Sequence, residues 1–273
     1  MQTSCLVCDV HLNLLSKSDG VNIFYCPVCG LGATDPASII VSNQKYHRDA
    51  LYKASVEQFS NIFQKRVDII SRFIQAGRIL EVGSSTGLLL SLLKVKGWDV
   101  LGVEPSRDAA TFAKGKGIET LIKTFEQTEL KKESFDLVIL NHTLEHMRNP
   151  LAVLEKARTV LKADGLVFID VPNFGSLTAK LMGAKWPYIL PHEHYWHFTK
   201  DSLFHILKKC GFQPIYWEAH SGIWGYGNPA KEIWQSFTQR KKRFFLNVIT
   251  AIPSFILTRF KLGTGLTVVA RKK

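Results

Sequence analysis

The sequence lacks several features that would assign it to a class directly. Residues 244–260 are apolar, but Asn247, Pro253 and Arg259 interrupt them. A helix that crosses a bilayer needs about 20 mostly apolar residues, so a membrane span is not predicted. The N-terminus shows no basic region followed by an apolar core, and a signal peptide is not expected. We therefore expect a cytoplasmic protein that keeps its thiols reduced.

Acidic residues are few relative to basic ones. The 273 residues include 23 Asp and Glu but 35 Lys and Arg, which gives a formal net charge of +12. This balance favours an anionic partner such as nucleic acid, an acidic membrane face or a phosphorylated substrate. Four consecutive basic residues, 240–243, stand directly before the apolar stretch. Such a segment can bind an anionic membrane peripherally, and packing on the sheet or on a partner subunit is the open alternative.

Cysteine is sparse too, yet four of the five cysteines form two Cys-x-x-Cys pairs, Cys5 with Cys8 and Cys26 with Cys29. In a reducing compartment such pairs favour a metal site over disulfides. Their spacing predicts a zinc ribbon over residues 1–35. Four thiolates leave no open position on the metal, so the Zn²⁺ would be structural. Unrelated cysteines or a redox pair are the alternatives.

The rest of the chain has the pattern of an α/β protein. Residues 36–76 are predicted as a connector with an amphipathic N-terminal helix over 56–76. Elements then alternate through 77–273, with strands at 78–82, 99–104, 120–123, 135–141, 165–171, 213–218 and 266–270, and helices at 87–96, 106–114, 150–161 and 201–210. The alternation predicts a Rossmann-like, seven-stranded, mostly parallel sheet whose ligands bind beyond the carboxyl ends of the strands.

Two segments depart from this alternation. Residues 173–200 are rich in aromatic, His and Pro residues, and we expect them to form a substrate loop over the strand ends. Residues 228–262 hold the basic run and the apolar stretch and are expected to form an insertion.

The turn after the first strand of the sheet is the expected ligand site. Gly83-Ser84-Ser85-Thr86-Gly87 joins an apolar strand to an apolar helix, and glycine lets a backbone pass close to a ligand. A dinucleotide fingerprint needs Gly-x-Gly-x-x-Gly, but Ser85 and Leu88 occupy the second and third of these positions. The Gly-Lys-[Ser/Thr] of a P-loop is lacking as well, so phosphate binding is poorly supported. Two acids remain: Glu81 on the first strand and Glu104 at the end of the second.

These residues resemble the class I S-adenosylmethionine-dependent methyltransferases. Glu81-x-Gly83-x-x-x-Gly87 is similar to motif I of that family, and Glu104 stands where the family has the acid that binds the ribose hydroxyls. Ser85 departs from the family, which most often has Gly there. Three further segments resemble the family's fourth-strand motif, its turn before strand five and its helix before strand six: 135–150, 162–166 and 197–212.

The resemblance implies S-adenosylmethionine as the methyl donor, together with a set of residues that bind it. The set is Glu81, Gly83, Ser84, Gly87, Glu104, Phe125, Asn141 and His142. Phe125 is expected near the adenine, and Asn141 and His142 near the methionine part. The branch with a similar 197–212 segment acts on sugars, lipids and small metabolites, so the implied acceptor is a small-molecule, sugar or lipid-linked compound.

A hydroxyl or a carbon acid must lose a proton when it is methylated, which requires a base. His194 and His192, in the expected substrate loop, are the candidate catalytic residues. Two other functions stay open. The ribbon and the net charge of +12 are also similar to bacterial rRNA guanine methyltransferases, which would make an rRNA or tRNA base the acceptor. No RNA-type motif is found, so nucleic acid is the less favoured partner. A methyltransferase fold can also serve as a non-catalytic binding module.

Overall fold

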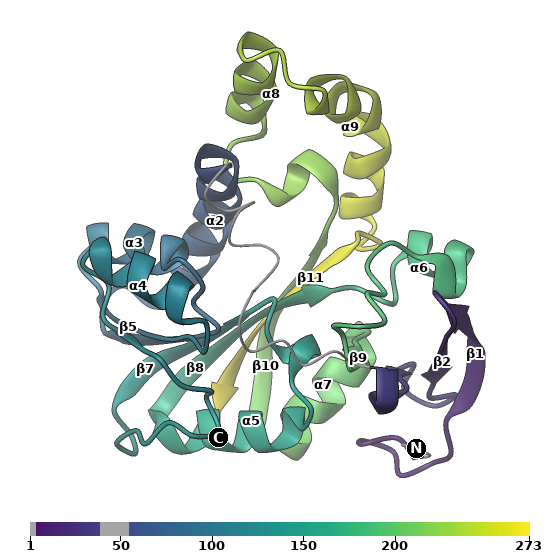
Figure 1. The fold of residues 1–273 in the computed structure, drawn as a ribbon, viewed down its shortest axis with the longest axis horizontal. Helices are drawn as coiled ribbons and strands as arrows, with labels where there is room; N and C mark the ends of the chain where they lie inside the picture. Colours follow the sequence, from purple (N-terminus) through teal and green to yellow (C-terminus); the bar gives the residue numbers. More distant parts are fainter. Residues whose placement is uncertain (1–3, 39–54) are drawn as a thin grey trace.

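A seven-stranded sheet forms the centre of the protein (Figure 1). The computed structural model describes residues 4–38 and 55–273, so part of the connector expected at 36–76 lies outside the described chain. The strand order is β10-β11-β8-β7-β4-β5-β6, and β11 alone runs opposite to the other six strands. The predicted mostly parallel sheet is confirmed. Its strands are β4 (Arg78–Val82), β5 (Asp99–Val103), β6 (Thr120–Leu121), β7 (Phe135–Asn141), β8 (Leu161–Pro172), β10 (Phe212–His220) and β11 (Gly265–Lys272).

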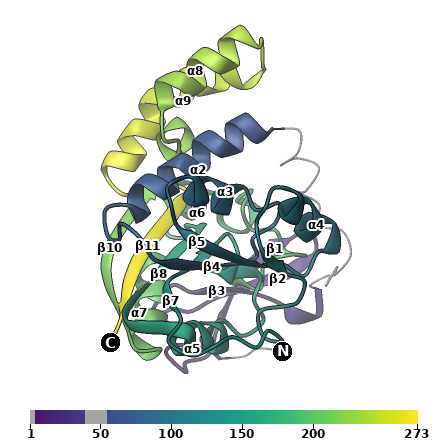
Figure 2. The same cartoon turned by 90° about the vertical axis from the view of Figure 1, so that its left-hand side faces the viewer.

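Helices cover both faces of this sheet (Figure 2). Successive strand residues point to opposite faces, and Ile79 and Leu80 accordingly lie in two different apolar clusters. The Ile79 cluster contains residues of α2 (Val56–Ile70), α3 (Leu88–Val95) and α4 (Arg107–Gly115), and the Leu80 cluster contains residues of α5 (Pro150–Val160) and α7 (Lys200–Lys209). The central strands are therefore apolar on both faces, as parallel strands between two helix layers are.

Helix α2 is shorter than the sequence predicts, since it ends at Ile70 and not at residue 76. The backbone N–H groups of Arg72 and Phe73 donate to the carbonyls of Ile69 and Ile70, so the last turn tightens. Phe73 then lies beside Tyr216 of β10, with 5.4 Å between the ring centroids. The other predicted helices and strands agree with the structure except for a few residues at their ends.

A second, four-stranded sheet joins the N-terminal region to the expected substrate loop. Strand β9 comes from that loop and pairs antiparallel with β3, with Gly32 opposite His197. Trp186 of the same loop packs with Val21 and Ile23. The loop thus carries regular structure of its own. The sheet is β1 (Asn13–Ser18), β2 (Val21–Tyr25), β3 (Gly32–Thr34) and β9 (Trp196–His197), and the loop also holds α6 (Leu177–Met182) and the 3-10 helix η3 (Gly183–Lys185).

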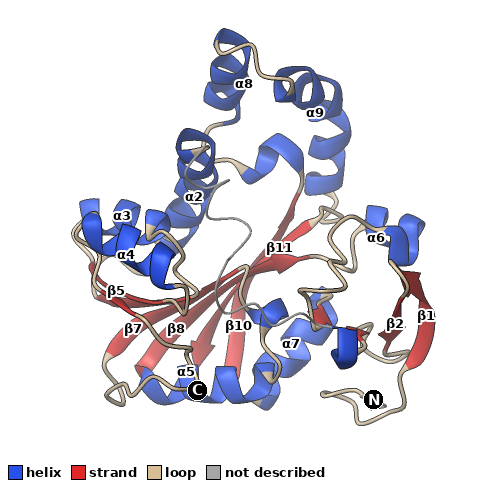
Figure 3. Ribbon diagram, viewed as in Figure 1, coloured by secondary structure: helices blue, strands red, loops and turns tan. Residues whose placement is uncertain are grey.

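The insertion expected at 228–262 is a pair of helices, α8 (Pro229–Thr238) and α9 (Arg243–Arg259), which we call the α8–α9 arm. It follows β10 and the short helix η4 (Gly222–Gly225) and leads into β11. The arm stands away from the sheet in both views (Figures 1 and 2) and is largely helical (Figure 3). Strands β10 and β8 are both antiparallel to β11, so they run in the same direction. The arm therefore leaves the sheet at its carboxyl edge, where ligands of such sheets bind.

Candidate active site

The turn between β4 and α3 borders an open pocket at the carboxyl edge. Its empty volume is about 270 Å³, and four of the predicted donor-binding residues line it together with Phe63, Leu88 and Leu89: Glu81, Gly83, Ser84 and Asn141. Gly83 has a φ of 71°, and a Cβ at this position would lie 2.8 Å from Thr143 Oγ1. Ser85 adopts a φ of 46°, in the left-handed region that favours glycine. The turn thus folds as expected without the second glycine.

Glu104 directly follows β5, and backbone bonds fix its carboxylate beside this turn. Its two oxygens accept hydrogen bonds from the N–H groups of Ser85 and Ser106, each 2.8 Å long. The residue is 4% exposed. Its carboxylate therefore has a fixed position at the turn, where the resemblance places the ribose-binding acid.

Three polar atoms of the pocket-lining residues are buried and make no hydrogen bond within the described chain: Glu81 Oε2, Ser84 Oγ and Asn141 Oδ1. Buried polar groups in native proteins nearly always have partners. Burial, and then the nearby charge of Glu104, raise the pKa of Glu81 well above its usual range. A ligand with a cationic amino group and hydroxyls would satisfy these atoms. S-adenosylmethionine carries both, so the residues present fit this donor.

Phe125 and His142, which were also predicted to bind the donor, lie differently. Phe125 is 2% exposed in the core, with Lys156 Nζ 5.0 Å from its ring centroid. It is not among the described residues that line the pocket, and its place beside the adenine stays a prediction. His142 follows β7 with a φ of 50° and directs Nδ1 to Glu145 Oε1 at 3.3 Å.

The two candidate bases have different surroundings. His194 is buried, and its Nδ1 lies 3.1 Å from the carbonyl oxygen of Tyr188. A carbonyl only accepts, so Nδ1 carries the proton and Nε2 has the lone pair in the neutral ring. His192 is exposed, with Nδ1 3.0 Å from the carbonyl oxygen of Ser38. Both rings direct Nδ1 to a backbone carbonyl oxygen, and they differ in that His194 is buried and His192 is exposed.

His194 belongs to a cluster that the sequence did not reveal. Its ring meets that of His146 edge to face, with centroids 4.6 Å apart. One ligand atom each of Glu145, His146 and His194 lie within 4.8 Å of one another, so the cluster could hold a metal ion. Glu145 and His146 belong to the 3-10 helix η2 (Leu144–His146), which closely follows β7. The cluster is therefore connected by a few residues to Asn141 in the donor pocket.

Comparison with known proteins identifies the family. A profile of the methyltransferase domain matches residues 46–216, a segment that contains the turn, Glu104 and Asn141. The chain belongs to the class I S-adenosylmethionine-dependent methyltransferases. It is therefore an enzyme with a Rossmann-like fold, as the resemblance implied.

Relatives of this methyltransferase are distant. The chain is 29% identical over 154 residues to an uncharacterized protein of Methanocaldococcus jannaschii, covering 56% of this chain and 73% of that protein. It is 29% identical over 150 residues to a ubiquinone biosynthesis O-methyltransferase of Cereibacter sphaeroides, covering 50% of this chain and 61% of that enzyme. The C-methyltransferase NovU of Streptomyces niveus is 30% identical over 142 residues, which cover 50% of this chain and 33% of NovU.

Among solved structures, the fold is similar to that of a possible histamine N-methyltransferase from Thermotoga maritima. The TM-score is 0.57 at 18% sequence identity, and the match covers 84% of this chain and all of the other. At this identity the likeness supports the fold alone. Two of the curated relatives are named as an O-methyltransferase and a C-methyltransferase.

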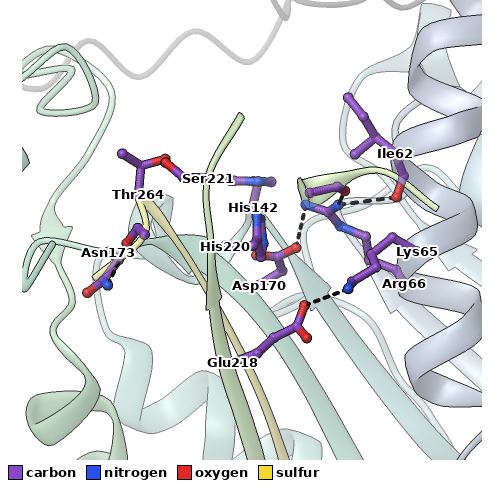
Figure 4. Close-up of polar contacts among 12 residues, drawn as sticks. Ile62, Lys65, Arg66, His142, Asp170, Asn173, Glu218, His220, Ser221 and Thr264 are labelled. Carbon is purple, nitrogen blue, oxygen red and sulfur yellow. Dashed lines mark hydrogen bonds and ion pairs between the residues drawn. The ribbon is translucent and has the colours of Figure 1, made fainter. Parts of the chain in front are cut away.

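A buried ion pair of the methyltransferase lies next to the pocket and was not predicted (Figure 4). Asp170 of β8 is the register partner of Asn141, and its Oδ2 lies 2.6 Å from Arg66 Nη2 of α2. His220 Nε2 is 3.7 Å from the other oxygen. Burial alone would raise the pKa of Asp170, but the Arg66 charge and the His220 contacts outweigh it and hold this pKa low. The sequence offered one signal for this pair, because Asp170 is a charged residue within the apolar strand predicted at 165–171.

The four N-terminal cysteines come together as the spacing predicts. Their sulfur atoms all lie within 4.8 Å of one another. The N–H groups of Val7 and Cys29 point to the sulfurs of Cys5 and Cys26, at 3.4 and 3.5 Å. Thiolates in this arrangement are a donor set suited to Zn²⁺. The cysteine cluster therefore suggests the structural zinc site.

Proposed function

We propose that this methyltransferase transfers a methyl group from S-adenosylmethionine to a hydroxyl oxygen or an acidic carbon of a small-molecule, sugar or lipid-linked acceptor. The observation that carries the proposal is the orientation of His194. Its Nδ1 donates to the carbonyl of Tyr188, so Nε2 carries the lone pair of the neutral ring, and its cluster partners Glu145 and His146 follow Asn141 of the donor pocket by a few residues. The relatives include a ubiquinone biosynthesis O-methyltransferase and a C-methyltransferase, and methylation of a hydroxyl or an acidic carbon releases such a proton.

Residues of the pocket bind and orient the donor. The Glu104 carboxylate, which the backbone N–H groups of Ser85 and Ser106 hold in place, would accept hydrogen bonds from the ribose hydroxyls. Glu81 and Asn141 would bind the cationic amino group of the methionine part, because their buried oxygens line the pocket. When bound, S-adenosylmethionine supplies a methyl group on a positively charged sulfur. Fixing reactants in this way contributes about 7–11 kcal/mol in well-oriented cases.

The acceptor side is formed by the substrate loop and the Glu145–His146–His194 cluster. His194 removes the acceptor proton, and the His146 ring packs against the His194 ring in an edge-to-face contact that orients it. A base in this position contributes about 10²–10⁴-fold to the rate. A fixed donor pocket together with a proton acceptor on the substrate loop therefore supports methyl transfer to oxygen or carbon.

Calorimetry with S-adenosylmethionine tests the donor site first. The wild type should bind, and Glu104→Ala should weaken binding about tenfold or more, because hydrogen bonds to a charged group contribute about 1.5–3 kcal/mol each. Glu119→Ala, which removes an exposed carboxylate outside the pocket, is the matched control. Equal affinities for Glu104→Ala and the control would refute the assignment.

Release of S-adenosylhomocysteine then identifies the acceptor class. Sugar nucleotides, isoprenoid phenols and small hydroxy compounds are offered in turn, with tRNA and rRNA as competing acceptors. Turnover with a hydroxyl or carbon-acid compound supports the proposal. Turnover with RNA alone contradicts it.

A further inference from the structure

In the α8–α9 arm the buried side chains are polar and many of the exposed side chains are apolar. Both of its helices bury polar side chains, and the buried residues of α9 are Asn247 and Ser254. The outward positions are apolar: Phe245 is 68% exposed, and Ile249 and Ile252 are each 73% exposed. Seven more large apolar side chains of the arm or its end are exposed: Trp234, Phe237, Leu246, Val248, Phe255, Ile256 and Phe260. A surface helix normally shows the opposite pattern, and apolar patches of this kind mark interaction surfaces.

The charge around this apolar surface is almost entirely positive. The basic run 240–243 connects α8 to α9, and Arg259 and Lys261 lie at the other end of α9. The only acid within 228–262 is Glu232. Glu232 is buried and paired with Arg243 at 2.9 Å, so it adds no negative charge to the surface. The arm therefore presents a wide apolar face with exposed cations at both ends.

We propose that the α8–α9 arm docks on an anionic lipid bilayer, with α9 lying in the plane of the interface. Helices bind membranes in this way when an apolar face enters the acyl boundary and basic residues meet anionic headgroups. Crossing the bilayer is not required, since α9 has 17 residues and no helix of the described chain is long and apolar enough for a span. The positive charge at both ends of α9 selects an anionic lipid surface as the occupant.

The arm is held firmly against the catalytic domain. Arg243 Nη1 donates to Gln58 of α2 at 2.8 Å, and Asn61 Nδ2 donates to the carbonyl of Asn228 at 3.2 Å. At the base of the arm, Arg66 Nη1 donates to the carbonyl of Gly225 at 2.9 Å. The same guanidinium pairs with Asp170 (Figure 4). These contacts fix the arm relative to the carboxyl edge of the sheet.

Docking would therefore turn the carboxyl edge toward the membrane. The arm begins after His220 and ends before Gly265, and both lie at the edge that carries the donor pocket. An acceptor anchored in the bilayer could then reach the site without leaving the lipid. This corollary rests on the proposed methyl transfer, whereas the docking itself does not.

Co-sedimentation of the full chain with vesicles tests the docking. The wild type should bind vesicles that contain phosphatidylglycerol and should bind pure phosphatidylcholine at least about tenfold more weakly, with salt reducing the difference. The variant Ile249→Asp/Ile252→Asp should lose binding about tenfold or more, and so should Arg240→Glu/Lys242→Glu. Val95→Asp is the matched control, because Val95 is an 88% exposed apolar residue at the far end of α3.

Correct folding of the variants is checked by thermal unfolding and by donor affinity. Binding of Ile249→Asp/Ile252→Asp at the wild-type level, or failure of the wild type to bind anionic vesicles, would overturn the proposal. A wild-type dimer in sedimentation equilibrium that the same variant disperses, without vesicle binding, would assign the surface to a second copy instead. Glu104→Ala should still bind vesicles, so failure of the methyl-transfer proposal remains distinguishable.

Discussion

The guanidinium of Arg66 lies 2.6 Å from the carboxylate of Asp170, and both side chains are almost completely buried. The pair connects α2 to the strand beside the donor pocket. Breaking it from one side leaves a charge in the interior without compensation. Such a loss costs about 3–5 kcal/mol, far more than the loss of an exposed pair.

Arg66→Met should therefore lower the free energy of unfolding by about 3–5 kcal/mol, measured by denaturant titration. Lys96→Met is the control, because Lys96 and Asp68 form a half-exposed pair at 3.8 Å and should contribute less than about 1 kcal/mol. Adding Asp170→Asn to Arg66→Met should recover part of the loss. Equal costs for Arg66→Met and Lys96→Met would show that the buried pair is not a stabilising contact.

At pH 8, Glu81→Gln should maintain or raise the stability of the protein but weaken its binding of the donor. The raised pKa means that folded Glu81 holds its proton more tightly than unfolded Glu81 does. Its stabilisation is therefore full below the unfolded pKa near 4.3 and is lost as the pH rises through the folded pKa. The variant should match or exceed the wild type in melting temperature at pH 8, and its advantage should shrink at pH 5. Its affinity for S-adenosylmethionine should fall about tenfold or more.

The measurements for Glu81 are melting curves at both pH values and calorimetry with the donor. If the wild type gained stability relative to Glu81→Gln between pH 5 and pH 8, this would contradict both the burial of the Glu81 carboxyl group and its raised pKa.

His194→Asn should reduce kcat by about 10²–10⁴-fold once an acceptor is known, because it removes the proposed base. Its affinity for the donor should stay unchanged, since His194 is not among the described residues that line the donor pocket. His192→Asn is the matched variant, and its exposed side chain predicts a kcat close to that of the wild type. Reversed effects of the two variants would transfer the role of base to His192.

Metal analysis should find about one zinc per chain if the four N-terminal cysteines hold it. Cys26→Ser should lose this metal, and Cys210→Ser should keep it, because Cys210 lies apart on α7's C-terminal side. Hydrogen exchange should then increase at residues 196–197, since β9 depends on β3 for its pairing. Zinc content that Cys26→Ser leaves unchanged would contradict the predicted site.

His197 predicts an acid-sensitive stability. Burial lowers the pKa of His197 to about 3, and Nε2 lies 2.9 Å from Thr34 Oγ1. The unfolded histidine, with a pKa near 6.5, takes up a proton that the folded one excludes. The contribution of neutral His197 to the free energy of unfolding is full above pH 6.5 and falls by about 1.4 kcal/mol per pH unit toward pH 3. Denaturant titrations between pH 7 and pH 4 should show a shallower decline for His197→Gln.

The exposed His205 provides the control for this experiment. His205→Gln should keep the wild-type dependence on pH. An unchanged slope in His197→Gln would show that other groups cause the acid sensitivity.

Local sequence patterns were enough for the central sheet. The predicted strands at 78–82 and 135–141 have the same bounds in the structure, because each is an apolar run between turn residues. The helix predicted at 201–210 begins one residue earlier, after Thr199, whose side chain accepts a hydrogen bond from the backbone N–H of Ser202 as an N-cap does. Glu81 and Asn141 were placed in the pocket by a combination of spacing and resemblance.

Contacts between distant segments were not accessible in the same way. Strand β9 has two residues and β3 has three, which is too short for a periodic signal. The pairing of Arg66 with Asp170 joins a helix to a strand far along the chain, and each local pattern explains only one partner. The stretch 244–260 was recognised as apolar, but its outward orientation depends on where Asn247 and Ser254 pack.

The position of the α8–α9 arm in the sheet has a consequence for how the enzyme can change. His220 and Gly265 face each other in the ladder of β10 and β11. The arm therefore enters and leaves the sheet at a single rung, as the loop of a β-hairpin does. A short turn in its place would close the same hairpin with every strand pair kept. The proposed membrane docking and the methyl-transfer chemistry could thus vary separately, because the arm is an enlarged loop and the catalytic sheet is complete without it.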